Sequence, residues 1–161
     1  NKIKDDYNNA KKLAKSSNIK PSVLSGMPFK DTWYLPYGNS WAVQFLNDAN
    51  ASYLWSNVYG KGSLSLNFEA VLEKAKTADY WVAIGDFQTK KQLLDSNLHY
   101  NQFNMVKDNN VYISNKKGAT GGLLFYELAP SRPDLILKDL IKIFHPELLP
   151  NYQLNFYTQL N

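Results

Sequence analysis

The residue types that most often carry out catalysis or hold metals are few in this sequence. Cysteine is absent, and His99 and His145 are the only histidines. A cysteine nucleophile is therefore excluded, and a zinc site lacks ligands at workable spacing, so we expect both histidines to be structural. No serine lies in a G-x-S-x-G elbow, and Gly118, Gly121 and Gly122 lack the spacing of a dinucleotide-binding loop. A Ser-His-Asp triad stays open because its members converge only in space, but nothing here positively indicates an enzyme.

Aromatic side chains give a second chemical signal. They make up 14% of the chain, with 11 Tyr and 4 Trp, which is a high share of residues suited to gripping a partner. The segment 29–41 carries Trp33, Tyr34 and Tyr37 without a clear period, so we expect a loop. A polar, aromatic loop between a strand and a helix is where open α/β folds bind ligands. At least one of the three side chains is predicted to face a ligand, the alternative being that they cover the core.

Composition and charge exclude several classes of protein. The net charge is only +4, and the basic residues are scattered, with pairs at 11–12, 90–91 and 116–117. Such pairs indicate solvated faces rather than a nucleic-acid track, so we expect no nucleic-acid partner. No apolar run approaches the roughly 18 residues of a membrane span, and no signal peptide opens the chain. The first residues read as a helix without a start, which suggests a piece of a longer polypeptide.

Helices and strands are predicted to alternate through the first half. Apolar residues at spacings of three and four indicate a helix over 3–14. A buried strand is expected over 21–27, then a helix over 41–49 capped by Asn39-Ser40, then a short strand over 51–55.

The stretch from Gly62 to Asp86 contains both junctions of one α-then-β unit. Asn67 is the expected helix cap, and Glu69 lies in the first turn, where the helix dipole favours a carboxylate. A helix of about three turns follows. Residues 80–84 are apolar at odd and even positions alike, as expected of a strand that is covered on both faces.

The second half continues the alternation. A weaker helix is predicted over 89–98, and it could continue over 100–106 after a break. A strand follows over 111–114, then a polar, mobile or ligand-facing loop over 115–122, a helix over 134–144 opened by Pro133, and an irregular tail over 150–160. The fold class is therefore α/β, with a mostly parallel, Rossmann-like sheet between helices in three layers.

Four stretches, in order, resemble the C-terminal lobe of the substrate-binding proteins of iron-chelate and cobalamin ABC importers, the class with a rigid helix between two lobes. They are GNSWAVQFLNDANASYLW, SLSLNFEAVLEKAKTADYWV, FNMVKDNNVYISNK and RPDLILKDLIKIFHPELLP. The last, with His-Pro-Glu, looks most like variants from Bacteroidetes-type bacteria. The segment ATGGLLFYE departs from the polar and aromatic pattern of these relatives, which leaves the ligand open.

The resemblance implies a division of the chain and a set of ligand contacts. Residues 1–17 would be the end of the interlobe helix and 18–161 the C-terminal lobe, with the N-terminal lobe absent. Ligand would bind between the lobes, and aromatic faces suit a macrocycle or catecholate. Lysines or an arginine could pair with an anionic chelate, although Arg132 could equally pair locally. The implied contacts are Trp33, Tyr34, Tyr37, Asn39, Trp41, Asp86, Lys116, Lys117 and Arg132.

The resemblance also implies partners and a location. Glu69 matches, by its place at a helix start, the exposed glutamate that docks this lobe on the membrane permease; the alternative is a simple dipole-stabilising acid. The protein would be periplasmic or lipid-anchored and would bind a ferric siderophore, with a corrinoid or haem as the alternative ligand. It would need no catalytic cofactor and no bound metal of its own. From another class, the alternative is an α/β enzyme fragment with a site among Asp86, His99 and Lys116.

Overall fold

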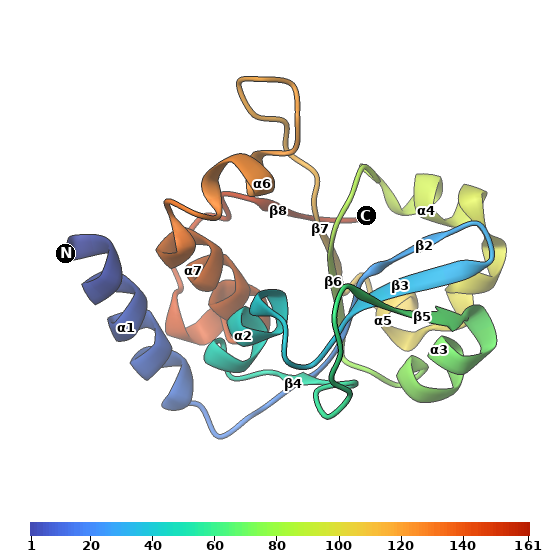
Figure 1. Cartoon of the computed structure of the whole chain (residues 1–161), viewed down its shortest axis with the longest axis horizontal. Helices are drawn as coiled ribbons and strands as arrows, with labels where there is room; N and C mark the ends of the chain where they lie inside the picture. The colour runs from blue at the N-terminus through green and yellow to red at the C-terminus, as the bar shows by residue number, and fades with distance from the viewer.

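A five-stranded sheet forms the centre of the molecule. The computed structural model describes all of residues 1–161 (Figure 1). In the order β4-β1-β6-β7-β8, the first four strands are parallel and β8 is antiparallel to β7. The mainly parallel α/β prediction is thus confirmed. The strands are β1 (Ser22–Ser25), β4 (Ser52–Tyr53), β6 (Tyr80–Ile84), β7 (Val111–Ser114) and β8 (Tyr157–Gln159).

A second, antiparallel sheet replaces the loop that was expected over 29–41. Its strands are β2 (Met27–Phe29), β3 (Thr32–Pro36) and β5 (Ser63–Asn67), in that order. The loop prediction was wrong because β3 is too short for its period to stand out: Trp33 and Leu35 are buried while Tyr34 between them is exposed. Lys30 closes the β2–β3 turn in the left-handed region, at φ 56°.

Helices cover both sides of the main sheet, which completes the expected three layers. In Figure 1, α1, α2, α6 and α7 lie on one side, and α3, α4 and α5 lie on the other. The predicted N-caps are confirmed, since Ser40 accepts a hydrogen bond from the N–H of Val43 (3.3 Å) and Asn67 accepts one from that of Ala70 (2.8 Å). The helices are α1 (Lys2–Lys15), α2 (Trp41–Asp48), α3 (Phe68–Ala75), α4 (Lys90–Ser96), α5 (Asn104–Lys107), α6 (Leu124–Leu128) and α7 (Pro133–Phe144), with 3₁₀ turns η1 (Leu98–Gln102) and η2 (Pro146–Leu148).

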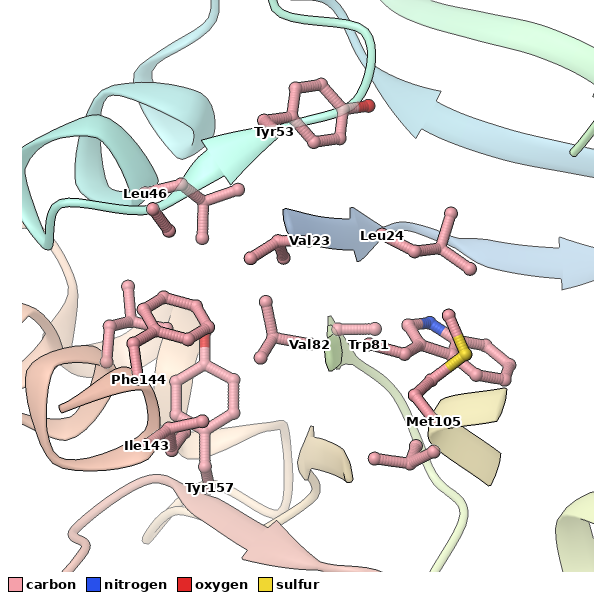
Figure 2. Packing of buried hydrophobic residues seen from close by; sticks show 14 of the residues in the cluster. Val23, Leu24, Leu46, Tyr53, Trp81, Val82, Met105, Ile143, Phe144 and Tyr157 are labelled. Carbon is pink, nitrogen blue, oxygen red and sulfur yellow. The ribbon is translucent and has the colours of Figure 1, made fainter. Parts of the chain in front are cut away.

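The central strands are buried on both faces, as the apolar composition of residues 80–84 predicted. Figure 2 shows Val82 directed toward Phe144 of α7, and Trp81 directed the opposite way, toward Met105 of α5. On that second side Trp33 lies 4.9 Å from Trp81, ring centroid to centroid, and the indole N–H of Trp81 donates to the carbonyl of Gly26 at 3.0 Å. Trp33 is 1% exposed. Its predicted ligand-facing role is therefore wrong, and the alternative, that it covers the core, is correct.

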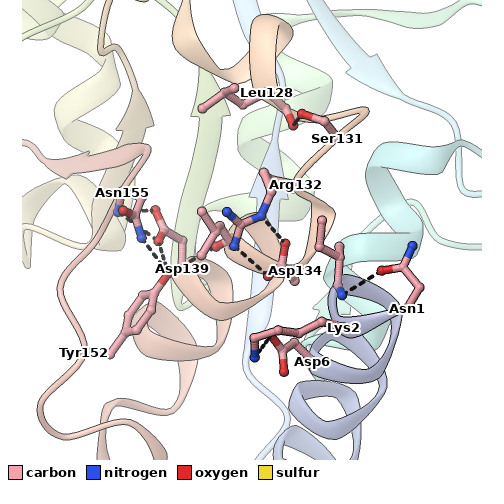
Figure 3. A network of polar contacts seen from close by, with 12 residues as sticks. Asn1, Lys2, Asp6, Leu128, Ser131, Arg132, Asp134, Asp139, Tyr152 and Asn155 are labelled. Atoms are coloured by element: carbon pink, nitrogen blue, oxygen red, sulfur yellow. Dashed lines mark hydrogen bonds and ion pairs between the residues drawn. The ribbon is translucent and has the colours of Figure 1, made fainter.

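A buried carboxylate organises the tail that was predicted to be irregular. Asp139 of α7 accepts hydrogen bonds from the backbone N–H groups of Asn155 (2.9 Å), Phe156 (2.8 Å) and Tyr157 (3.2 Å), and from the Tyr152 hydroxyl (3.0 Å). Figure 3 shows this carboxylate beside Tyr152 and Asn155. Burial raises the pKa of Asp139, and the hydrogen bonds oppose that shift. The tail is thereby held in place, and β8 pairs with β7 instead of remaining a loop.

His145 has the structural role that was expected. Its side chain is buried where α7 ends, and its Nε2 lies 3.1 Å from the carbonyl oxygen of Ala49 and 3.2 Å from that of Asn50. It therefore joins the end of α7 to the end of α2. His99, by contrast, is exposed on η1. No helix combines the length and the apolar character that crossing a membrane requires.

Candidate ligand-binding site

A cavity of about 790 Å³ lies where β1 and β6 end. Carboxyl ends of parallel strands are the usual binding edge of an open α/β sheet, and this volume lies within the range of ligand pockets. The cavity is bounded by the β2–β3 hairpin, the start of α2 and the helix α6. The side chains that define its walls are Met27, Phe29, Tyr34, Trp41, Phe45, Asp86, Phe87, Gln92, Phe125, Tyr126 and Tyr157.

Aromatic rings form the most exposed part of this wall. The Trp41 side chain is 57% exposed, and its ring stacks on Phe125 with centroids 6.0 Å apart and planes at 27°. Phe45 meets the same indole edge-on, at 5.9 Å and 82°. Trp41 is thus supported from behind by two rings while one face stays open, an arrangement that suits stacking on a flat or apolar ligand surface.

The chain needs a glycine at the cavity's edge, where β1 turns into β2. Gly26 has φ +87°, and a Cβ atom there would lie 2.2 Å from the carbonyl oxygen of Tyr34. Only glycine tolerates both the left-handed backbone and this close approach. Gly26 therefore lets the β2–β3 hairpin fold directly beside the strand ends and carry Tyr34 into the cavity wall.

The structure brings only part of the predicted contact set together. Tyr34, Trp41 and Asp86 all line the cavity. Tyr37 instead packs against Gly60, where an added Cβ would lie 2.6 Å from its ring. Asn39 accepts a hydrogen bond from the backbone N–H of Gly60 at 3.1 Å, so these two residues secure the 57–62 loop and lie outside the cavity.

The three predicted cations lie outside the cavity lining, and each has a partner within the protein. The Lys116 ammonium group donates to the carbonyl of Leu154 at 3.1 Å, and that of Lys117 pairs with the Asp86 carboxylate at 2.9 Å. Arg132 pairs with Asp134 through Nε and one Nη, both at 3.0 Å (Figure 3).

The Arg132–Asp134 pair is the local arrangement that was the alternative for this arginine. The guanidinium lowers the pKa of the buried Asp134 carboxyl, and the hydrogen bonds to that carboxylate raise the pKa of Arg132. A charge so engaged is not available to a ligand unless Asp134 is left buried and unpaired.

Sequence reasoning missed the aromatic contribution of α6. The segment ATGGLLFYE appeared to lack an aromatic pattern, yet its Phe125 and Tyr126 both line the cavity. The loop before them projects above α6 (Figure 1). Glu127 holds this loop by accepting hydrogen bonds from the backbone N–H and the hydroxyl of Thr120, and those bonds lower the pKa of Glu127. The adjacent Phe-Tyr pair was the signal that could have located this wall.

A second cavity, of about 770 Å³, lies beside the first. It is bounded by the start of α1, the start of α2 and the turn before α7, and Trp41 and Phe45 line both cavities. The Trp41 side chain therefore stands between the two hollows. No group of three or more His, Cys, Asp or Glu residues could hold a metal ion in the structure.

Comparison of sequences finds a distant relative of this chain. No protein-family model matches the chain. An uncharacterised lipoprotein of Methanocaldococcus jannaschii is 27% identical over an alignment of 163 positions, which covers 99% of this chain and 37% of that protein. The chain thus spans little more than a third of that relative.

Several solved structures share the fold of this chain. The TroA-like periplasmic binding protein FepB from Veillonella parvula matches with a TM-score of 0.67 and 16% identity, over 99% of this chain and 56% of that one. IsdE of S. aureus complexed with heme matches with a TM-score of 0.64 and 17% identity, over 88% of this chain and 54% of that one. FhuD of Vibrio cholerae with bound Fe³⁺-Desferal matches with a TM-score of 0.59 and 14% identity, over 89% of this chain and 54% of that one. The chain therefore has the fold of the TroA-like periplasmic substrate-binding proteins and spans about half of their length.

Proposed function

We propose that this chain is the C-terminal lobe of the substrate-binding component of an ABC importer, and that it captures a metal chelate without catalysing a reaction. The observation that carries the proposal is the open, aromatic cavity at the ends of β1 and β6, with Trp41 exposed in its wall. An open half-site of this kind suits a ligand enclosed between two lobes. Residues 18–161 would form this lobe, and residues 1–17 the end of a helix that leads to the other.

The attachment of α1 supports this division. Asp48 of α2 is buried and accepts a hydrogen bond from the Tyr7 hydroxyl, and Lys11 pairs with the same carboxylate at 3.3 Å. Gln44 donates to it at 2.9 Å. Two polar contacts from α1 to one buried carboxylate of α2 fix the two helices together, and the Gln44 bond within α2 orients that carboxylate, as expected of an interlobe helix that moves with this lobe.

The similar structures support the class of ligand. In the solved structures, IsdE is complexed with heme and FhuD holds Fe³⁺-Desferal. A ferric siderophore is the ligand that we propose first, with a corrinoid or haem as alternatives of the same class. The lipoprotein relative supports a periplasmic or lipid-anchored location. No observation favours the enzyme alternative, because Asp86 and Lys116 have separate partners and His99 lies on η1 beside Phe68.

Titration of the full-length protein with ferric siderophores, haem and cobalamin tests the proposal. Trp33, Trp55 and Trp81 are buried whereas Trp41 is exposed in the cavity, so ligand binding should quench the Trp41 share of the fluorescence. Trp41→Phe is the matched control and should bind with that share of the quenching removed. If no chelate binds to the wild-type protein by calorimetry or by quenching, the transport proposal fails.

Glu69 is the proposed contact with the permease. It is exposed in the first turn of α3 and does not line the cavity. We expect Glu69→Ala to reduce chelate uptake by about fivefold or more, because the variant would lose about one ion pair at the interface with the permease. Ligand affinity should remain unchanged, because no cavity contact is lost.

The control for Glu69 is Glu73→Ala, which removes an equally negative and exposed side chain one turn further along α3. Uptake by this variant should match the wild type. Reduced ligand affinity in Glu69→Ala, or the same uptake defect in both variants, would show that the docking role is misassigned.

A further inference from the structure

We propose that the chelate presents an uncharged face to this lobe, and that the site selects uncharged chelates, such as ferric trihydroxamates or corrinoids, over polyanionic ones such as ferric catecholates. This inference rests on the proposed function and narrows its ligand class. It reverses the expectation from sequence, in which lysines or an arginine would pair with an anionic chelate.

The charge content of the cavity carries the argument. Of its 27 lining residues, 17 are hydrophobic, and Asp86 is the only one with a charged side chain. The remaining polar contributors are neutral, chiefly Ser25, Ser40, Ser63 and Gln92. The lining therefore offers an anionic ligand no cation, and its one charged side chain is a carboxylate whose partner, Lys117, is already engaged.

The three cations predicted to contact the ligand cannot supply the missing charge without a cost. Lys117 lies next to the cavity, but its ammonium group is paired with Asp86 at 2.9 Å. If Lys117 turned to an anionic ligand, Asp86 would lose its partner within the same cleft. Lys116 is directed to the carbonyl of Leu154, away from Asp86, and Arg132 is bound to Asp134 on α7.

Desolvation makes the difference between the two ligand classes. Closing a charged chelate against the open Trp41 face and the Tyr126 and Phe29 rings would remove water from its anionic oxygens and replace that water with apolar surface. An uncharged chelate has an apolar or weakly polar periphery and loses far less hydration, while it gains the ring contacts in full. The same walls therefore favour the uncharged class.

The decisive experiment compares two ferric chelates on the full-length protein by calorimetry, with ferrichrome as the uncharged trihydroxamate and ferric enterobactin as the polyanionic tricatecholate. Cyanocobalamin serves as an uncharged corrinoid. We expect the tighter of the two uncharged ligands to bind at least about tenfold more strongly than the tricatecholate. If the tricatecholate binds as tightly or more tightly, this inference is wrong although the transport function stands. If no chelate binds, both fail.

Variants at the ion pair assign any selectivity to this lobe. Asp86→Asn should strengthen tricatecholate binding by about threefold to tenfold, because it removes the repelling carboxylate and frees Lys117, and should leave uncharged ligands within about twofold. Lys117→Gln should weaken only the tricatecholate. Both side chains are largely exposed, with 81% for Asp86 and 56% for Lys117, so neither change should impair folding. An Asp86→Asn variant with unchanged selectivity would overturn the assignment.

Discussion

Replacement of Asp139 by asparagine is expected to lower the free energy of unfolding by about 2–4 kcal/mol. Both carboxylate oxygens act as acceptors: one faces the N–H of Asn155 and the Tyr152 hydroxyl, and the other faces the N–H groups of Phe156 and Tyr157. An asparagine keeps one acceptor, but its NH₂ group would point a donor at donors. At least one buried N–H would then lose its partner, and hydrogen bonds to charged groups are the stronger kind.

Urea unfolding followed by circular dichroism measures this effect. Asp108→Asn is the control, because it makes the same chemical change at an exposed site that makes no side-chain hydrogen bond or ion pair. The control should shift stability by less than about 0.5 kcal/mol. Equal small effects in both variants would mean that the tail is held by its apolar contacts, chiefly Phe156 and Leu160, and not by Asp139.

The main sheet was predictable because its signals are local. Residues 80–84 are apolar at every position, and burial on both faces follows from that composition alone. The caps at Ser40 and Asn67 were predictable for the same reason, since an N-cap needs only its own side chain and the N–H three residues on. The α3 helix nevertheless ends after Ala75, about a turn earlier than expected.

The hairpin and the tail could not be predicted locally, because tertiary partners decide them. The β3 strand exists by pairing with β5, which lies about thirty residues away, and β8 exists because Asp139 binds the backbone that precedes and enters it. Trp33 shows the consequence for the site: an aromatic residue in a polar segment looked ligand-facing, but the hairpin register turns it into the core and turns Tyr34 outward.

The cations were misjudged for a related reason. Lysine and arginine in polar loops look available when only the sequence is known, because their partners lie far along the chain. Lys117 meets Asp86 from the end of a neighbouring strand, and Lys116 meets the carbonyl of Leu154 in the tail. Whether a charge is free to bind a ligand is a property of the assembled fold, and here it changes the expected ligand class.

Truncation of Trp41 to alanine is expected to weaken chelate binding by about 10-fold to 100-fold, the usual loss for a central aromatic anchor. The indole offers its open face to the cavity while Phe125 and Phe45 hold it from behind, so its orientation is fixed before the ligand arrives. Stability should change little, because more than half of the side chain is exposed. Calorimetry is the appropriate measurement, since this variant also loses the fluorescent reporter.

Two further variants distinguish specific binding in the cavity from non-specific adsorption to exposed aromatic rings. Tyr126→Ala removes a second exposed ring of the cavity wall and should weaken binding in the same direction, by about 3-fold to 30-fold. Tyr59→Ala removes a ring that is 70% exposed but lies outside the cavity, and it should leave affinity within about twofold. Equal losses at Tyr59 and Trp41 would mean that chelates adhere to exposed rings wherever they lie. An unchanged affinity in Trp41→Ala would place the ligand outside both cavities, because Trp41 lines both of them.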